Sequence, residues 1–188
     1  MCIRDRLSTV VNNGDVQRST VSSLVVTLEG DVELDAGAIN VLQRSDASGA
    51  TGVVVGTSFT TALVGGNTVV TISFSGSLTR NSIGALVDGN YQLGIDGSRV
   101  RRAGTNVTMG QNYSYGDSAA DGFYTYYGDS DGNRTIGSSD LLAFRQTFRR
   151  STGIAGFNAN LDYSDDGNIG SPDLLAFRQR FRRTLAFS

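Results

Sequence analysis

The segment SFTTALVGGNTVVTISF, residues 58–74, gives the clearest indication of the fold. Two runs rich in Val, Ile, Thr and Phe stand on either side of a Val-Gly-Gly-Asn connection at residues 64–67. β-Branched and aromatic residues favour strands, and glycines in a short connection favour a tight turn between antiparallel strands. We therefore expect residues 58–63 and 68–74 to form a β-hairpin.

Similar short runs lie on both sides of this hairpin, separated by Gly, Asn and Asp. We expect further strands at residues 23–28, 38–43, 53–55, 90–95 and 100–102. About seven short strands at this spacing indicate an antiparallel β-sandwich. The chain has no Trp and a single Cys, so the landmarks of antibody domains are absent and only the general immunoglobulin-like architecture is predicted.

Composition limits the possible functions. The 188 residues suffice for one ordinary domain or two small ones, and a net charge of −2 produces no global field that would attract nucleic acid. No run reaches the roughly 20 apolar residues that cross a membrane. With no His, and with Cys2 as the single Cys, we expect neither a zinc site nor a catalytic triad nor imidazole catalysis. The sequence therefore predicts a protein that is not an enzyme.

An internal repeat dominates the last third of the chain. The sequence DSDGNRTIGSSDLLAFRQTFRR at residues 129–150 is followed, 33 residues later, by DYSDDGNIGSPDLLAFRQRFRR at residues 162–183. Each copy begins with a twelve-residue loop that has oxygen-bearing side chains at positions 1, 3, 5 and 12. This is the spacing with which an EF-hand loop surrounds Ca²⁺, where position 7 adds its main-chain carbonyl.

The repeat thus predicts two calcium sites. The expected ligands are Asp129, Asp131, Asn133, the carbonyl of Thr135 and Asp140 in loop one, and Asp162, Ser164, Asp166, the carbonyl of Asn168 and Asp173 in loop two. Leu and Phe recur at helical spacing after each loop, so one helix should follow each of them. Ile occupies position 8 in both loops, and we expect Ile136 and Ile169 to pair across a short β-bridge that ties the two sites together.

The two loops differ at individual positions. Loop one has Arg134 at position 6, where Gly normally supplies a positive φ, and this Arg brings a cation close to the site. Loop two keeps Gly167 at this position but has Ser164 as a weaker ligand at position 3. We expect calcium to bind more tightly to the loop formed by residues 162–173.

Two loops that are each followed by one helix, and that end in Asp rather than Glu, resemble the type I dockerin family. Asp140 and Asp173 carry this last feature, and the resemblance covers residues 123–184. It implies a small α-helical pair of calcium loop–helix motifs. Dockerins attach extracellular enzymes to cohesins through loop positions 10 and 11, which implies a partner-binding role for Ser138, Ser139, Ser171 and Pro172.

The order of segments resembles planctomycete surface proteins in which such a tail follows a bacterial Ig-like module. The resulting prediction is multidomain, with an all-β immunoglobulin-like sandwich followed by the dockerin-like module. The expected divisions are a non-native leader at 1–6, the sandwich at 7–103, a linker at 104–122 and the calcium-binding domain at 123–188. The leader is expected because its sequence looks like a translated sequencing adapter.

The predicted function is that of a non-catalytic, calcium-binding structural or attachment module of a secreted or cell-surface bacterial protein. Its expected partners are calcium and a cohesin-like protein or a cell-surface component. The alternative is a dockerin that docks an extracellular polysaccharide-degrading enzyme onto a cohesin. No signal peptide is visible in the sequence, so the extracellular location follows from the resemblance alone.

Overall fold

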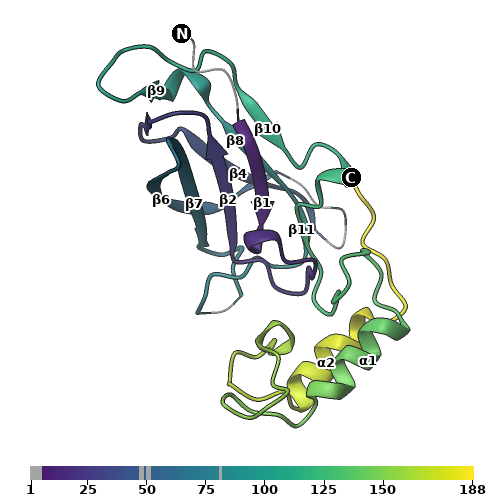
Figure 1. Ribbon diagram of the computed structural model, residues 1–188. Coiled ribbons are helices and arrows are strands. Elements are labelled where there is room, and N and C mark those ends of the chain that lie inside the picture. The colour runs from purple at the N-terminus through teal and green to yellow at the C-terminus, as the bar shows by residue number, and fades with distance from the viewer. Residues whose placement is uncertain (1–5, 47–48, 50–51, 81) are drawn as a thin grey trace.

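The computed structural model describes residues 6–46, 49, 52–80 and 82–188. Two antiparallel sheets pack face to face, and two short helices lie beyond one end of them (Figure 1). The first sheet has the order β1-β2-β7-β6. Its strands are β1 (Arg6–Val11), β2 (Ser23–Leu28), β6 (Gly56–Val64) and β7 (Asn67–Ser75). The expected hairpin is confirmed, because β6 and β7 pair along their full length and the turn glycines, Gly65 and Gly66, both have positive φ.

The second sheet has the order β10-β8-β4-β5, and β11 also pairs with β8. Its strands are β4 (Ile39–Asp46), β5 (Val53–Val54), β8 (Gly89–Ile95), β10 (Tyr113–Tyr115) and β11 (Tyr124–Thr125). A small ribbon of β3 (Val32–Leu34) and β9 (Val100–Arg102) lies apart from both sheets. Buried residues alternate with half-buried or exposed ones along β2, β4 and β7, as expected for strands that cover a core with one face.

Two helices follow the two loops of the repeat. Helix α1 spans Ser138–Thr147 and helix α2 spans Ser171–Arg180. They pack through Phe144 and Phe177, whose ring centres are 4.8 Å apart and whose side chains are buried. At ten residues each, neither α-helix of the described chain has the length or the apolar run needed to span a bilayer.

The two loops pair reciprocally, and not with each other as expected. Ile136 of loop one exchanges main-chain hydrogen bonds with Arg182 and Arg183, which follow α2. Ile169 of loop two does the same with Arg149 and Arg150, which follow α1. Each loop is therefore paired with the segment that follows the helix of the other copy. The direct Ile136–Ile169 bridge was a wrong prediction, although both side chains lie in one buried cluster.

The expected division into a sandwich and a separate α-helical module is wrong. Strands make up 37% of the chain, and no EF-hand-like helical pair is present among the described residues. An α-helix follows each loop, and only the 3₁₀ turn Ala159–Leu161 directly precedes loop two. Phe123 lies in the sandwich core, with its ring centre 5.7 Å from that of Tyr91 and 6.3 Å from that of Phe74. The structure is thus a single β-rich domain.

Residues on both sides of the expected boundary take part in the sheets. The range 104–122, expected to be a linker, contributes β10, which pairs with β8 through Tyr113 and Ile95. The strand that follows it, β11, pairs with the other end of β8. Of the expected leader, residues 1–5 lie outside the described chain, and Arg6 is the first residue of β1. The change in amino-acid composition near residue 122 therefore does not coincide with a boundary between separately packed parts of the chain.

Candidate metal centre

Loop one gathers three carboxylates. One ligand oxygen from each of Asp129, Asp131 and Asp140 lies within 4.8 Å of the others. The side chains of Asp129 and Asp140 are fully buried, whereas Asp131 is exposed. Three negative groups this close repel one another, and burial makes the repulsion costlier, so a cation among them would lower the free energy of the folded state.

Asp140 is held in place by main-chain amides. It lies in the first turn of α1, and its Oδ1 accepts a hydrogen bond from Ser130 N at 2.8 Å. Its Oδ2 accepts a hydrogen bond from Gly137 N, also at 2.8 Å. Both donors belong to loop one, so the carboxylate that closes the loop is fixed against the start of the helix that follows it.

Asp129 has a denser set of donors. Its Oδ1 accepts hydrogen bonds from the amides of Gly132 and Asn133, and its Oδ2 accepts them from Arg134 N at 2.9 Å and from the Tyr124 hydroxyl at 2.6 Å. Burial raises the pKa of the Asp129 carboxyl, and these hydrogen bonds act in the opposite direction. Burial, together with the neighbouring Asp129, also raises the pKa of Tyr124. The site therefore holds a carboxylate whose ionised form costs free energy unless a positive charge lies beside it.

The remaining expected ligands of loop one lie on the same turn. Asn133 and Asp131 are exposed, and Asp131 reaches across the loop, where its Oδ2 accepts a hydrogen bond from the Ser139 hydroxyl at 2.8 Å. Asn133 Oδ1 accepts a hydrogen bond from Thr135 N at 2.7 Å. The available donors are carboxylate, amide and carbonyl oxygens, which are the ligands that Ca²⁺ prefers. The oxygen ligands of loop one are therefore of the kind that holds a hard divalent cation.

In loop two, as in loop one, main-chain amides donate hydrogen bonds to the aspartates at positions 1 and 12. Three carboxylates do not come close together there. Asp173 is fully buried and accepts hydrogen bonds from the amides of Tyr163, Ser164 and Gly170. Asp162 accepts hydrogen bonds from the amides of Asp166 and Gly167 and from the Ser164 hydroxyl. Asp166 is exposed, and its carboxylate accepts a hydrogen bond from Asn168 N. Across the described residues, the acidic trio of loop one is the only group of three carboxylates as close as 4.8 Å.

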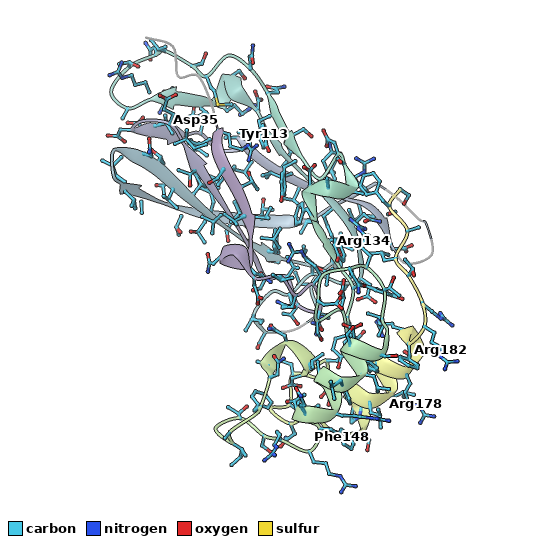
Figure 2. The ribbon with its side chains drawn as sticks, turned by 45° about the vertical axis from the view of Figure 1, so that its right-hand side comes forward. Asp35, Tyr113, Arg134, Phe148, Arg178 and Arg182 are labelled. Carbon is cyan, nitrogen blue, oxygen red and sulfur yellow. The ribbon has the colours of Figure 1, made fainter. Side chains whose placement is uncertain are left out.

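Arg134 has the expected positive φ but does not point its charge at the site. Its φ is 69°, close to the 78° of Gly167 at the same position of loop two. The guanidinium carbon lies 3.9 Å from the centre of the Tyr124 ring, and Nη1 donates a hydrogen bond to Asn90 Oδ1 at 2.6 Å. Figure 2 shows Arg134 at the level where the sandwich meets the loops. The cation thus joins loop one to β8, with cation–π and hydrogen-bond contacts that oppose the backbone strain.

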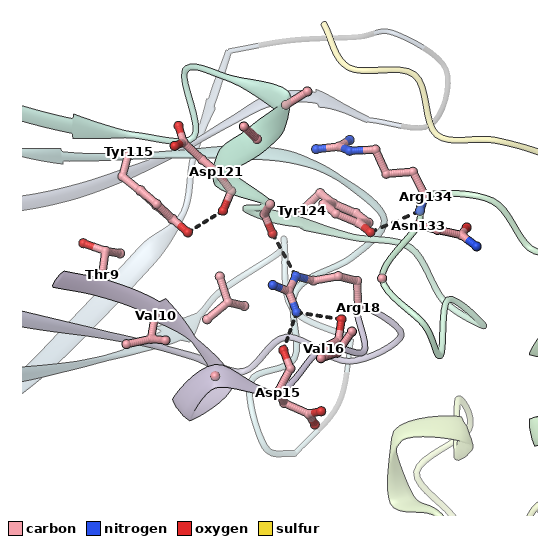
Figure 3. A pocket seen from close by; sticks show the side chains of 16 residues that line it. Thr9, Val10, Asp15, Val16, Arg18, Tyr115, Asp121, Tyr124, Asn133 and Arg134 are labelled. Carbon is pink, nitrogen blue, oxygen red and sulfur yellow. Dashed lines mark hydrogen bonds between the residues drawn. The ribbon is translucent and has the colours of Figure 1, made fainter.

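A cavity of about 680 Å³ lies between loop one and the connection from β1 to β2, and it is lined in part by Arg18, Tyr115, Tyr124 and Asn133 (Figure 3). The main chain bridges it at one end, because the amides of Arg18 and Ser19 both donate to the carbonyl of Asp129, at 2.8 and 3.0 Å. The guanidinium of Arg18 donates to main-chain carbonyls on both sides of the cavity. The residue that begins loop one is therefore tied directly to the sandwich.

These contacts name two residues that the sequence did not single out. Tyr124 donates to the first carboxylate of loop one, and Arg18 connects this loop to residues more than 100 positions earlier. Tyr124 lies five residues before loop one, outside the spacing that identifies metal ligands. The only hint in the sequence is the local enrichment of Tyr between residues 113 and 127.

The four residues expected to bind a partner lie at the starts of the helices. Ser138, Ser139, Ser171 and Pro172 are all exposed. The 33-residue repeat places the two pairs at equivalent positions of α1 and α2, and both helices begin after a Gly cap. The hydroxyl of Ser139 is already engaged with Asp131.

The close approach of loop one to the sandwich leads to a test. A Cβ added to Gly132, which has a φ of 73°, would lie 2.3 Å from the carbonyl oxygen of Val16. We expect Gly132→Ala to cost about 2–3 kcal/mol, because it adds a clash with main chain to the strain of a positive φ. Denaturant unfolding in calcium-free buffer measures the loss.

Gly153→Ala is the matched control. Gly153 has a φ of 85°, and no atom of the described chain lies within 4 Å of an added Cβ. This variant should lose only the strain, about 1 kcal/mol. Equal losses in the two variants would contradict the tight contact between loop one and residue 16.

Comparison with protein-family models, with curated proteins and with solved structures found no match to this chain.

Proposed function

We propose that this chain is a non-catalytic, calcium-binding structural module of a secreted or cell-surface protein, with its principal site in loop one. The observation that carries the proposal is the trio Asp129, Asp131 and Asp140, with two carboxylates fully buried and all three within 4.8 Å. A hard divalent cation offsets this charge and accepts six to eight oxygen ligands. Asn133 and the carbonyl of Thr135 would complete the set supplied by the protein.

The role of the ion is structural, because the ligands are built into the packing of the chain. Asp140 belongs to the first turn of α1, and the main chain of Asp129 accepts from Arg18 and Ser19. Ordering loop one thus orders the start of the helix and its attachment to the sandwich together. Loop two, with Asp162, Ser164, Asp166, Asn168 and Asp173, is the second and weaker candidate, since its carboxylates lie further apart.

Calcium titration tests this proposal. Isothermal calorimetry on the full chain should give a dissociation constant of about 10⁻⁴–10⁻³ M, the range of extracellular calcium modules. The melting temperature should rise with Ca²⁺ and return to its starting value when chelator is added. The same concentration of Mg²⁺ should raise it less, because Mg²⁺ demands octahedral geometry. No heat and no shift at millimolar Ca²⁺ would overturn the proposal.

Docking onto a cohesin-like protein is the second candidate. The observation in its favour is that Ser138, Ser139, Ser171 and Pro172 are exposed at equivalent positions of the two helices. Capture of the full chain by immobilised cohesin domains in calcium, lost on changing these four residues to Asp, would support attachment of a polysaccharide-degrading enzyme. No capture in calcium would leave the structural role alone.

A further inference from the structure

Strand β6 is an unprotected sheet edge. It is nine residues long, lies at the end of the order β1-β2-β7-β6, and has no charged residue and no Pro. Seven of its residues are exposed. A long, uncharged edge strand presents a row of main-chain donors and acceptors that another strand can use, and most proteins block such edges.

The other edges of the two sheets carry the usual protection. Strand β1, at the opposite edge of the same sheet, contains Arg6 and a register shift between Arg6 and Ser8. In the second sheet the edge strands β10 and β5 are three and two residues long. Charge, irregular pairing and shortness are the devices that discourage further strand addition. Among the described edges, β6 alone has none of them.

Exposed apolar side chains lie at both ends of this edge. Leu63 and Val64, at the end of β6, are each 59% exposed. Val53 and Val54 form β5, which ends two residues before β6 begins, and they are 47% and 68% exposed. Four of the large exposed hydrophobic residues of the described chain therefore border a single edge.

We propose that β6 pairs antiparallel with β6 of a second copy of this chain, joining two four-stranded sheets into one. With Thr60 at the two-fold axis, Val64 of one copy lies opposite Gly56 of the other. The C-terminal end of β6 in one copy then lies beside the N-terminal end of β6 in the other, which directly follows β5. Leu63 and Val64 of one copy therefore come next to Val53 and Val54 of the other.

A second copy fits this edge for two reasons. An isologous pair requires one surface to be self-complementary, and here the apolar groups at the two ends match each other when the strand is reversed. Because β6 carries no charge, bringing two copies together creates no like-charge pair across the new interface. The edge lies away from the helices and loops (Figure 1), so this pairing is independent of the proposed calcium site.

Introducing a charge at the centre of the strand tests the proposal. Sedimentation velocity on the full chain, from about 1 µM to about 1 mM, should show a concentration-dependent dimer, the behaviour of a small interface. Thr60→Lys and Thr60→Glu each place two like charges opposite one another, and each should weaken the dimer about tenfold or more. An equimolar mixture of the two variants should restore it.

Ser8→Lys, on the protected edge β1, is the control and should dimerise like the unchanged chain. Restoration by mixing shows that the single variants fold and that β6 faces β6. The proposal is overturned if the unchanged chain is a monomer at every concentration. It is equally overturned if mixing fails to restore the dimer, or if Ser8→Lys disrupts it and Thr60→Lys does not.

Discussion

Asp140→Ala should remove most of the stabilisation that calcium gives this chain, whereas Asp173→Ala should leave most of it in place. Both residues occupy position 12 of their loops, and both are fully buried. Asp140 belongs to the trio with Asp129 and Asp131, while the equivalent carboxylates of loop two are not gathered in this way. Losing one of three close carboxylates removes both a ligand and much of the attraction for the ion.

The two variants are matched in their structural cost. Asp140 accepts hydrogen bonds from two main-chain amides and Asp173 from three, so either substitution should destabilise the metal-free chain by about 3 kcal/mol or more. The difference between melting temperatures with Ca²⁺ and with chelator isolates the contribution of the metal. Asp31→Ala, at an exposed carboxylate of the sandwich, should leave this difference unchanged. A calcium shift that survives in Asp140→Ala and disappears in Asp173→Ala would place the principal site in loop two.

Phe177→Ala should destabilise the whole chain by about 3–5 kcal/mol, the cost of removing a large aromatic side chain from a packed core. Phe177 is fully buried, and its ring centre lies 4.8 Å from that of Phe144 and 6.1 Å from that of Phe181. Since the structure is a single domain, the loss should appear as one unfolding transition displaced downward by about 10 °C.

Calorimetry and near-ultraviolet circular dichroism check this expectation. The contacts that make the unfolding cooperative include the ion pair between Arg180 and Asp88, with a distance of 2.5 Å between Nε and Oδ2, and the hydrogen bond from Arg134 to Asn90. Leu175→Ala is the control on the same helix, because Leu175 is 61% exposed and should matter by less than about 0.5 kcal/mol. The contrary result is that Phe177→Ala unfolds in two transitions, the second at the melting temperature of the unchanged chain. That result would show that the helices unfold separately from the sandwich.

Much of the β-sheet structure could be predicted from the sequence. Runs of β-branched residues correctly located β2, β6, β7 and β8, because the side chains that favour strands also form the alternating buried face. Strands β1, β3, β10 and β11 were missed. Tyr113–Tyr115 lies in a Gly-, Asn- and Ser-rich stretch and becomes a strand only through its pairing with β8. The prediction of two domains was wrong for a related reason, since the burial of Phe123 in the sandwich core is a tertiary contact without a local signal.

The candidate site was predictable in part. The spacing of the loop identified the three acidic residues that the fold brings together, Asp129, Asp131 and Asp140. Spacing alone could not show that, among the described residues, three carboxylates gather in loop one and not in loop two. Nor could it show that the side chain of Arg134 turns toward Asn90, since that direction depends on β8.

Because the pairing of the two loops is reciprocal, the ordering of one loop favours the ordering of the other. The segment after α1 pairs with loop two, and the segment after α2 pairs with loop one. When one loop becomes ordered, it fixes the start of its own helix and the segment that follows the other helix. Each helix is then held at one end before the second loop becomes ordered. Part of the conformational entropy that the second loop must lose on ordering is thus already lost when the first loop becomes ordered. Ions entering the two loops would therefore bind with positive cooperativity, with a coupling that passes through the main chain rather than between the charges.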